Sequence, residues 1–212
     1  MSQAKTNLRA HDAKSVHRVH GELELKNLVR SFTADQLAAV QHTLLAVQQH
    51  IEDDCLKSHP KAEIVLNKLH STLNAQKDVL EAHLEQEFEG KCLETSVKDA
   101  VTNASGFLVG IYGRLRGEKV SRMVRDDITA ASFLATCYSM LYATAISLEV
   151  PSTAELASAH LHQLTPLIIE LSRVVPSVVI EELIIEGYPV NQIATLESIE
   201  EVIDAWSSRE RK

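Results

Sequence analysis

The chain has 212 residues, a formal net charge of −8, and few aromatic, glycine or proline residues. This length allows one large domain with a sizeable core, and a composition led by alanine, leucine, valine and glutamate is typical of an all-α protein rather than a β-sandwich. The negative charge argues against a protein that coats nucleic acid.

The three cysteines, Cys55, Cys92 and Cys137, are widely spaced and form no Cys-x-x-Cys pair. A zinc knuckle and a thioredoxin-like site are therefore not supported. Free thiols suit the reducing cytoplasm, and the N-terminal residues contain no apolar stretch of the kind found in secretory signals. We expect a cytoplasmic protein.

Residues 1–30 are polar and rich in histidine. Six basic and three acidic residues give this segment a charge of +3, so the remainder carries −11. We expect a basic arm over 1–30 that is partly disordered or packs only through its few leucines and Val29.

Apolar residues at 3-4 spacing predict a first long helix that begins at Thr33 and continues to Cys55. Thr33 and Gln36 match a capping box at its start. Pro60 is placed to open a second helix, whose stripe of alanine and leucine ends near Gly90.

Four glycines follow at spacings of four, three and four, namely Gly106, Gly110, Gly113 and Gly117. On a helix all four lie on one narrow face. Interior glycines cost a helix about 1 kcal/mol each relative to alanine. Either close contact with another helix offsets this cost or the segment is partly irregular; the lack of a turn signal favours the packed helix.

The stretch from Ile128 to Leu148 has twenty-one residues and no charged side chain, and it lies inside a helix predicted from about Lys119 to Val150. Its apolar residues do not keep to one stripe, so protein or lipid must cover it all round. Its length would span a membrane, but its eight serine, threonine and tyrosine residues argue otherwise. We expect a central helix that neighbouring helices bury on every side.

Pro151, followed by a capping box, predicts the start of the next long helix, and Pro166 is expected to kink this helix without ending it. Pro176 is expected to start a separate segment. Residues 177–186 are rich in β-branched side chains and fit a helix or a strand; their helical surroundings favour a helix.

A last helix is predicted from Ser198 through Trp206. Together the elements predict an antiparallel four-helix bundle with helical additions at both ends. The predicted parts are a basic N-terminal arm over 1–30, the four-helix bundle over 31–175 and a C-terminal helical extension over 176–212.

Di-iron bundles use a Glu-x-x-His pair on each of two helices, and none of the ten histidines here has a glutamate three residues before it. A weaker set remains. His83 and Glu87 are one helical turn apart, and Asp127 falls on an apolar seam of the long helix. With Glu52, these residues could form an unorthodox metal site for iron or manganese; the alternative is that they are caps and ion pairs.

One basic cluster occurs in the body of the chain, composed of Arg114, Arg116, Lys119, Arg122 and Arg125. It could bind an anion or nucleic acid. The alternative is an exposed helix junction, since Glu118 and Asp126 dilute the charge. The chain has no Gly-x-Ser-x-Gly elbow, Walker A loop or Rossmann fingerprint, so the sequence favours a protein that is not an enzyme.

Three stretches, HSTLNAQKDVLEAHLEQ, VRDDITAASFLATCYSMLYATAISL and LASAHLHQLTPLIIELS, follow the helix pattern of a known superfamily. Over residues 33–172 the chain resembles ferritin-like proteins, and among them the YciF-like bacterial stress proteins. Tyr138 and Leu141 stand where such proteins place metal ligands, so no ligand carries over. The resemblance implies a ferritin-like bundle, a homodimer and a stress-related role.

From these observations we expect a non-enzymatic, cytoplasmic helical-bundle protein that acts by self-association or by binding a protein partner, with no cofactor and no membrane span. The alternatives are a ferritin-like metal-binding protein with a non-standard site of histidine and carboxylates, and anion or nucleic-acid binding through the cluster 114–125.

Overall fold

A computed structural model describes residues 21–88 and 119–207, and the regular structure of these residues is entirely helical. This confirms the predicted all-α class. The elements are α2 (Glu22–Glu52), the short 3-10 helix η1 (Asp54–Ser58), α3 (Pro60–Glu87), α5 (Val120–Ser147), α6 (Pro151–Ile185) and α7 (Gln192–Ser207). The predicted glycine face at 106–117 and Cys92 lie outside the described residues.

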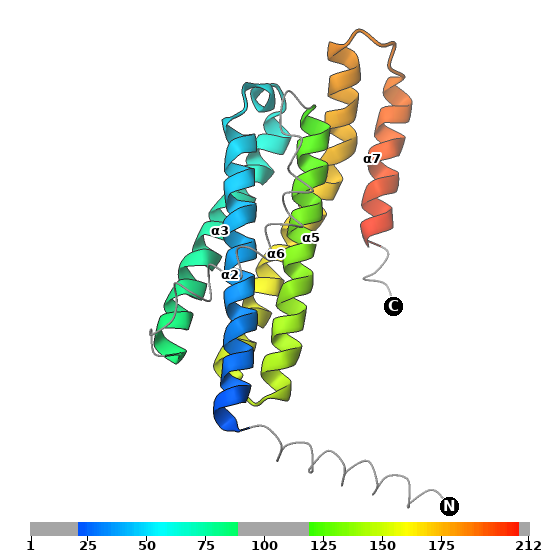
Figure 1. Ribbon diagram of the computed structural model, residues 1–212. Coiled ribbons are helices and arrows are strands. Elements are labelled where there is room, and N and C mark those ends of the chain that lie inside the picture. The colour runs from blue at the N-terminus through cyan, green and yellow to red at the C-terminus, as the bar shows by residue number, and fades with distance from the viewer. Residues whose placement is uncertain (1–20, 89–118, 208–212) are drawn as a thin grey trace, which may run out of the picture.

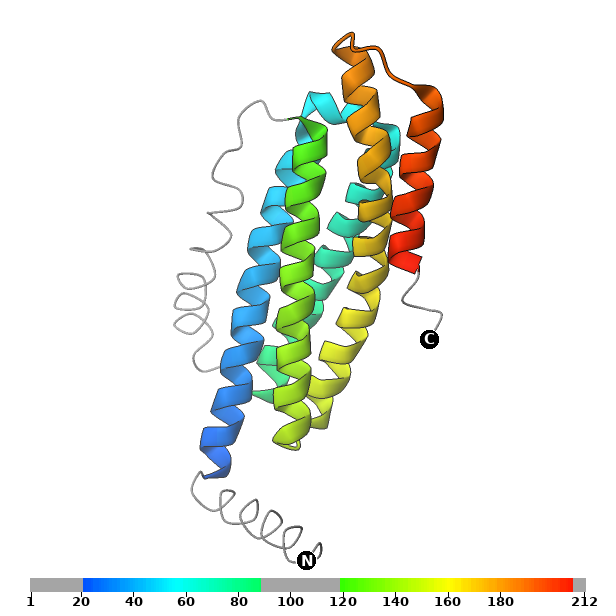
Figure 2. The same cartoon turned by 90° about the vertical axis from the view of Figure 1, so that its right-hand side faces the viewer.

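The four long helices α2, α3, α5 and α6 lie side by side (Figures 1 and 2). Helix α2 packs against α3 and α5, and α6 packs against the same two helices. Neighbouring helices in this arrangement run in opposite directions, because α2 and α6 point one way and α3 and α5 the other (Figure 1). Helix α7 folds back along the end of α6 and packs against it.

Leucines at helical spacing form the core between the four helices. On α3, Leu66, Leu69, Leu73 and Leu80 are fully buried, as the 3-4 pattern predicts. Burying a leucine side chain contributes roughly 1.5–3 kcal/mol relative to leaving it exposed. This apolar interior fixes which face of each helix points inward.

Two of the prolines predicted to open helices, Pro60 and Pro151, do so. Pro60 and Pro151 stand in the first turns of α3 and α6, where their fixed φ fits the helix and a missing N–H costs nothing. Glu149, in the turn between α5 and α6, has a φ of 59°. That left-handed conformation is costly for any residue with a Cβ atom.

The prediction that the first helix starts at Thr33 is wrong. Helix α2 begins at Glu22, after Gly21, and runs without a break through the predicted boundary at residue 30. The Thr33 hydroxyl donates to the Val29 carbonyl within the helix (2.9 Å) and so does not cap it. Val29 is fully buried, so tertiary packing extends the helix beyond the capping signal.

The end of the chain also differs from its prediction. Pro166 and Pro176 both lie inside α6, so Pro166 continues the helix as predicted, but Pro176 does not begin a new segment. Residues 177–185 are helical, which confirms the preference for a helix over a strand. The last helix, α7, begins at Gln192 rather than at Ser198.

Helix α5 is not buried on every side, contrary to prediction. It packs against α2 and α6, while Met140, Tyr142 and Ile146 are 51%, 41% and 54% exposed. Its length, and a mean hydropathy of 1.2 over its most apolar 18 residues, would by themselves let it cross a membrane, and the core helix of a water-soluble protein meets the same criteria. A third of its most apolar stretch is buried in the fold.

Candidate functional site

The four residues proposed as metal ligands occupy separate places. His83, near the end of α3, hydrogen-bonds through Nε2 to the Thr153 hydroxyl of α6 (2.8 Å). Asp127, near the start of α5 at the opposite end of the bundle (Figure 1), accepts from His50 of α2 (Nδ1 to Oδ2, 2.8 Å). Both interactions are fixed contacts between helices.

Glu52 and Glu87 are exposed, and Glu52 accepts a hydrogen bond from Gln48 on its own helix. The structure thus does not bring His83, Glu87, Asp127 and Glu52 together. Among residues 21–88 and 119–207, no three histidine, cysteine, aspartate or glutamate side chains converge in a way that could hold a metal ion.

The buried pair of His50 and Asp127 is charge-assisted. Burial lowers the pKa of His50, but the hydrogen bond and charge of Asp127, with smaller contributions from Asp126 and Asp53, outweigh it, so the net shift is upward. Both side chains are almost completely buried. Breaking such a pair by removing one partner is costly, so it fixes α2 against α5.

Two members of the predicted basic cluster, Arg114 and Arg116, lie outside the described residues. The other three are in the first turns of α5 or just before it. Lys119 pairs with Glu186 (2.6 Å) and Arg125 with Asp126 (2.7 Å), while Arg122 is exposed. Two of the three described cations are therefore engaged with carboxylates of the protein itself.

A buried hydrogen-bond network crosses the middle of the bundle. The Tyr138 hydroxyl of α5 donates to Gln76 Oε1 of α3 (3.0 Å), and His160 Nδ1 of α6 lies 3.0 Å from the same hydroxyl. Gln76 Nε2 donates to the His160 carbonyl and to Gln163 Oε1. Because the tyrosine donates to Gln76, the His160 ring completes the network as a donor.

Burial keeps this network uncharged. It raises the pKa of Tyr138 above its usual range and lowers the pKa of His160 to about 4. All three central side chains are at most 4% exposed. A sealed, neutral and mutually satisfied network positions helices and leaves no group directed at a substrate.

His160 is buried, whereas His162 two residues later is exposed. The signal that could have located the network is Gln76, the one amide that interrupts the leucine stripe of α3. A polar residue on a buried stripe must find partners from the facing helices.

Among the described residues, the most exposed apolar surface belongs to the end of α6, the turn after it and α7. We refer to residues 174–207 as the C-terminal hairpin. It holds seven of the fourteen large apolar side chains that are exposed in the described residues. They are Val179, Ile184, Ile185, Tyr188, Ile193, Leu196 and Ile203.

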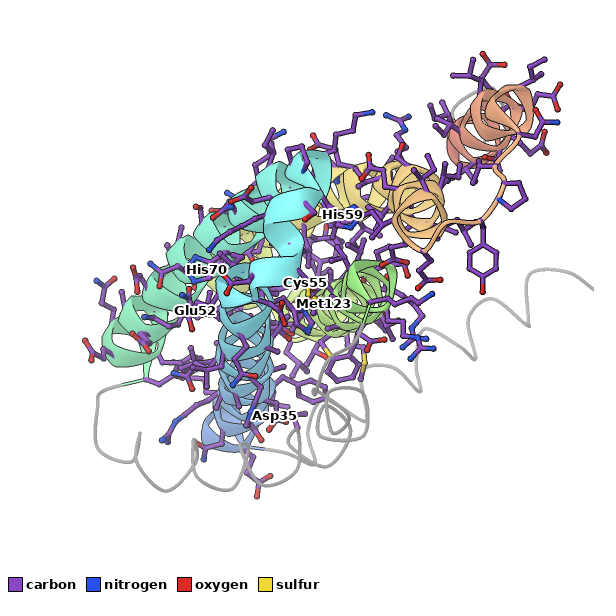
Figure 3. The ribbon with its side chains drawn as sticks, turned by 90° about the horizontal axis from the view of Figure 1, so that it is seen from above. Asp35, Glu52, Cys55, His59, His70 and Met123 are labelled. Carbon is purple, nitrogen blue, oxygen red and sulfur yellow. The ribbon has the colours of Figure 1, made fainter. Side chains whose placement is uncertain are left out.

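Figure 3 shows why this surface is open. Seen from above, α7 lies outside the group of four long helices, beside the end of α6. A shallow groove of about 520 Å³ runs between the two helices, lined mainly by Ile180, Leu183, Tyr188 and Pro189. A helix with a single neighbour is buried on one face only, so the apolar side chains on its other faces are exposed to solvent.

The C-terminal hairpin is also strongly acidic. Residues 174–207 contain seven carboxylates and no lysine, arginine or histidine. Three carboxylates attach the hairpin to the bundle: Glu182 accepts from the Ser121 backbone N–H and hydroxyl, Glu186 pairs with Lys119, and Glu181 lies 2.6 Å from His59. The other four belong to α7.

Comparison with known proteins gave no relative. No family model matches the chain, and neither characterised proteins nor solved structures show a significant similarity to it.

Proposed function

We propose that the protein is a non-enzymatic, cytoplasmic interaction protein, in which a ferritin-like bundle presents the C-terminal hairpin to a protein partner. One observation carries this proposal: within residues 21–88 and 119–207, half of the exposed large apolar side chains lie on the same acidic hairpin. An apolar patch of this kind on the surface of a protein commonly marks an interaction site.

The connectivity supports a ferritin-like scaffold. Helix α3 ends with Glu87 at one end of the bundle, and α5 begins with Val120 at the other (Figure 1). The parallel helices α3 and α5 are therefore joined by one long connection, while α2 to α3 and α5 to α6 are joined by short ones. A single long crossover is the connectivity of ferritin-like bundles.

The partner that fits the C-terminal hairpin best is a basic, amphipathic helix. Its apolar side would pack on isoleucine, leucine and tyrosine side chains, as in other helix-in-groove interactions. Its lysines or arginines would lie beside the carboxylates of α7. A second copy of the same hairpin would bring the four carboxylates of its α7 against the four of the first copy, which electrostatics disfavours.

A synthetic peptide tests this chemistry directly. The probe has leucine and lysine at helical spacing, and its matched control has glutamate in place of lysine. Isothermal titration calorimetry measures the affinity of each peptide for the full chain. We expect the lysine peptide to bind with roughly micromolar Kd and the glutamate peptide not to bind.

Point variants locate the site. Ile185→Ser and Leu196→Ser remove side chains that are 67% and 64% exposed, and each should weaken peptide binding about tenfold or more if these are central contacts. Leu45→Ser and Ile64→Ser are matched controls on α2 and α3, with side chains that are 63% and 58% exposed. These controls should leave binding unchanged.

Equal loss in all four variants would contradict a site on the C-terminal hairpin, as would equal binding of the two peptides. Light scattering decides between partner binding and self-association. A stable dimer that Ile185→Ser dissociates would replace the basic-helix partner with a second copy of the chain.

A further inference from the structure

A cavity lies between α2 and α5, away from the C-terminal hairpin. Its volume is about 220 Å³. The side chains that line it include Phe32, Asp35 and Ala39 from α2 and Phe133, Cys137 and Met140 from α5. This volume suits a molecule about the size of one substituted ring, since an engineered apolar cavity of roughly 150 Å³ accepts benzene. The charge of the lining then decides which kind of ring compound fits.

Asp35 is the one charged side chain among the described residues that line this cavity. The residue is exposed to solvent on one side, yet partial burial raises the pKa of its carboxyl group above the ordinary value. Within residues 21–88 and 119–207, no hydrogen bond or ion pair holds this carboxylate. A cation placed beside it would offset the cost of its desolvation.

The α5 side of the cavity carries no charge that could repel such a cation. Burial, with a smaller contribution from the charge of Asp35, raises the pKa of the Cys137 thiol to about 11, so this group stays protonated and neutral. The effect of Asp35 on Cys137 also shows that the carboxylate acts across the cavity. Phe32 and Phe133 add two aromatic rings to the lining, and the faces of aromatic rings attract ammonium groups.

The same lining disfavours the other classes of ligand. An anion would meet the Asp35 carboxylate without a basic side chain to hold it. A calcium or magnesium ion needs about six oxygen ligands, and the apolar side chains around Asp35 offer none. An organic cation needs only one carboxylate, because its apolar body can occupy the rest of the cavity.

We infer that this cavity is a binding site for a small organic ammonium ion with an apolar body. The body lies among Phe32, Phe133 and Met140, and the ammonium group donates a hydrogen bond to the Asp35 carboxylate. Hydrogen bonds between two ionised groups are stronger than those between neutral groups. Apolar walls with one placed polar group are the usual composition of a small-molecule site. This site is separate from the C-terminal hairpin and does not depend on the function proposed for it.

Three probes that share a ring and differ in charge test the inference on the full chain: benzylammonium, benzyl alcohol and benzoate. Binding is followed by the chemical shifts of the methionine methyl groups. Met140 lines the cavity, whereas Met123, buried near the start of α5, is an internal control. We expect benzylammonium to bind with roughly millimolar Kd and to shift Met140 but not Met123. Benzyl alcohol should bind more weakly, and benzoate weakest.

Asp35→Asn removes the charge and keeps the size of the side chain. Because Asp35 is exposed, this variant should fold as the wild type does. Benzylammonium should bind it about fivefold more weakly, the scale of one partly exposed ion pair, while the affinity for benzyl alcohol stays the same. Asp78→Asn is the matched control, since Asp78 is an exposed aspartate of α3. It should leave all three affinities unchanged.

Several results would overturn the inference. Benzoate that binds as well as benzylammonium would show that charge does not select the ligand, and equal affinity of benzylammonium for wild type and Asp35→Asn would remove Asp35 from the site. An equal loss in Asp35→Asn and Asp78→Asn would mean that only the net charge of the protein matters. Binding of the lysine peptide to the C-terminal hairpin should be the same in Asp35→Asn and wild type, so failure of one site is distinguishable from failure of the other.

Discussion

One hydroxyl group connects three helices of this protein. Tyr138 of α5 lies between Gln76 of α3 and His160 of α6, within hydrogen-bond distance of both. None of these side chains reaches solvent, so the partners cannot turn to water if the hydroxyl is lost.

Tyr138→Phe should therefore lower the free energy of unfolding by about 1–3 kcal/mol, the usual cost of leaving buried polar groups unpaired. The control is Tyr142→Phe, which removes a hydroxyl from a side chain that is 41% exposed. Denaturant unfolding monitored by circular dichroism measures both. An equal, small effect of the two substitutions would show that the network contributes nothing to stability.

The pair of His50 and Asp127 makes stability depend on pH with a defined sign. The pKa of His50 is raised in the fold above its ordinary value of 6.5. Its contribution is therefore complete below about pH 6.5 and disappears as pH rises through the raised value. His83 and His160, whose pKa values are lowered, act in the opposite direction, since they must stay neutral in the fold.

The difference in the free energy of unfolding between wild type and His50→Gln isolates the contribution of this pair. We expect the stability lost in His50→Gln to be largest at mildly acidic pH and to shrink toward alkaline pH, as measured by urea unfolding over a pH series. A loss that grows with rising pH would mean that His50 is neutral in the folded protein.

The sequence predicted that Asp127 is buried but did not predict which residue it pairs with, and the reason is physical. Asp127 was placed on the buried seam from its spacing, and it is buried there. Its partner His50 lies seventy-seven positions earlier in the chain, and no periodicity connects the two. Pairing across helices depends on their rotation and register, which a single sequence does not define.

Helices begin and end where local chemistry and packing agree. The prolines at 60 and 151 predicted two helix starts because a fixed φ and a missing N–H act locally. The starts of α2 and α7 were mispredicted because a plausible capping residue lay inside a longer helix. Pro176 was misread for a related reason: packing on both sides keeps α6 helical through it.

The turn between α5 and α6 offers a test at the scale of elements. Glu149 adopts a φ of 59° there, which glycine adopts without a steric penalty. Glu149→Gly should therefore raise the free energy of unfolding by about 0.5–1 kcal/mol. The control, Glu155→Gly within α6, should lower it by a similar amount. If both substitutions destabilise, the turn is not strained in solution.

The described part of the molecule divides into four long helices that pack together and one helix, α7, that is attached to them. Of the helices that the structure describes, only α6 packs against α7 to any significant extent, and Ile193 and Leu196 are 70% and 64% exposed. The all-α class was predictable from composition and periodicity. The open outer side of α5 was not, because an apolar run does not show which of its faces is covered.

Native-state hydrogen exchange should resolve this division. Amides of α7 should exchange faster than those in the middle of α3 and α5, because fewer buried contacts oppose their local opening. The lysine peptide described above should slow the exchange of the α7 amides, because its binding protects them. The glutamate peptide is the control and should leave their exchange unchanged. Equal protection of all helices without ligand would show that α7 is an integral part of the core.

The lack of any basic residue from 174 through 207 has a consequence for how the protein behaves at different ionic strengths. Because like-charged hairpins repel one another, the carboxylates oppose aggregation even though apolar side chains are exposed beside them. Salt screens repulsion and attraction alike. Added salt should weaken the binding of a basic helix while it promotes contact between copies, so the same surface is selective only within a limited range of salt.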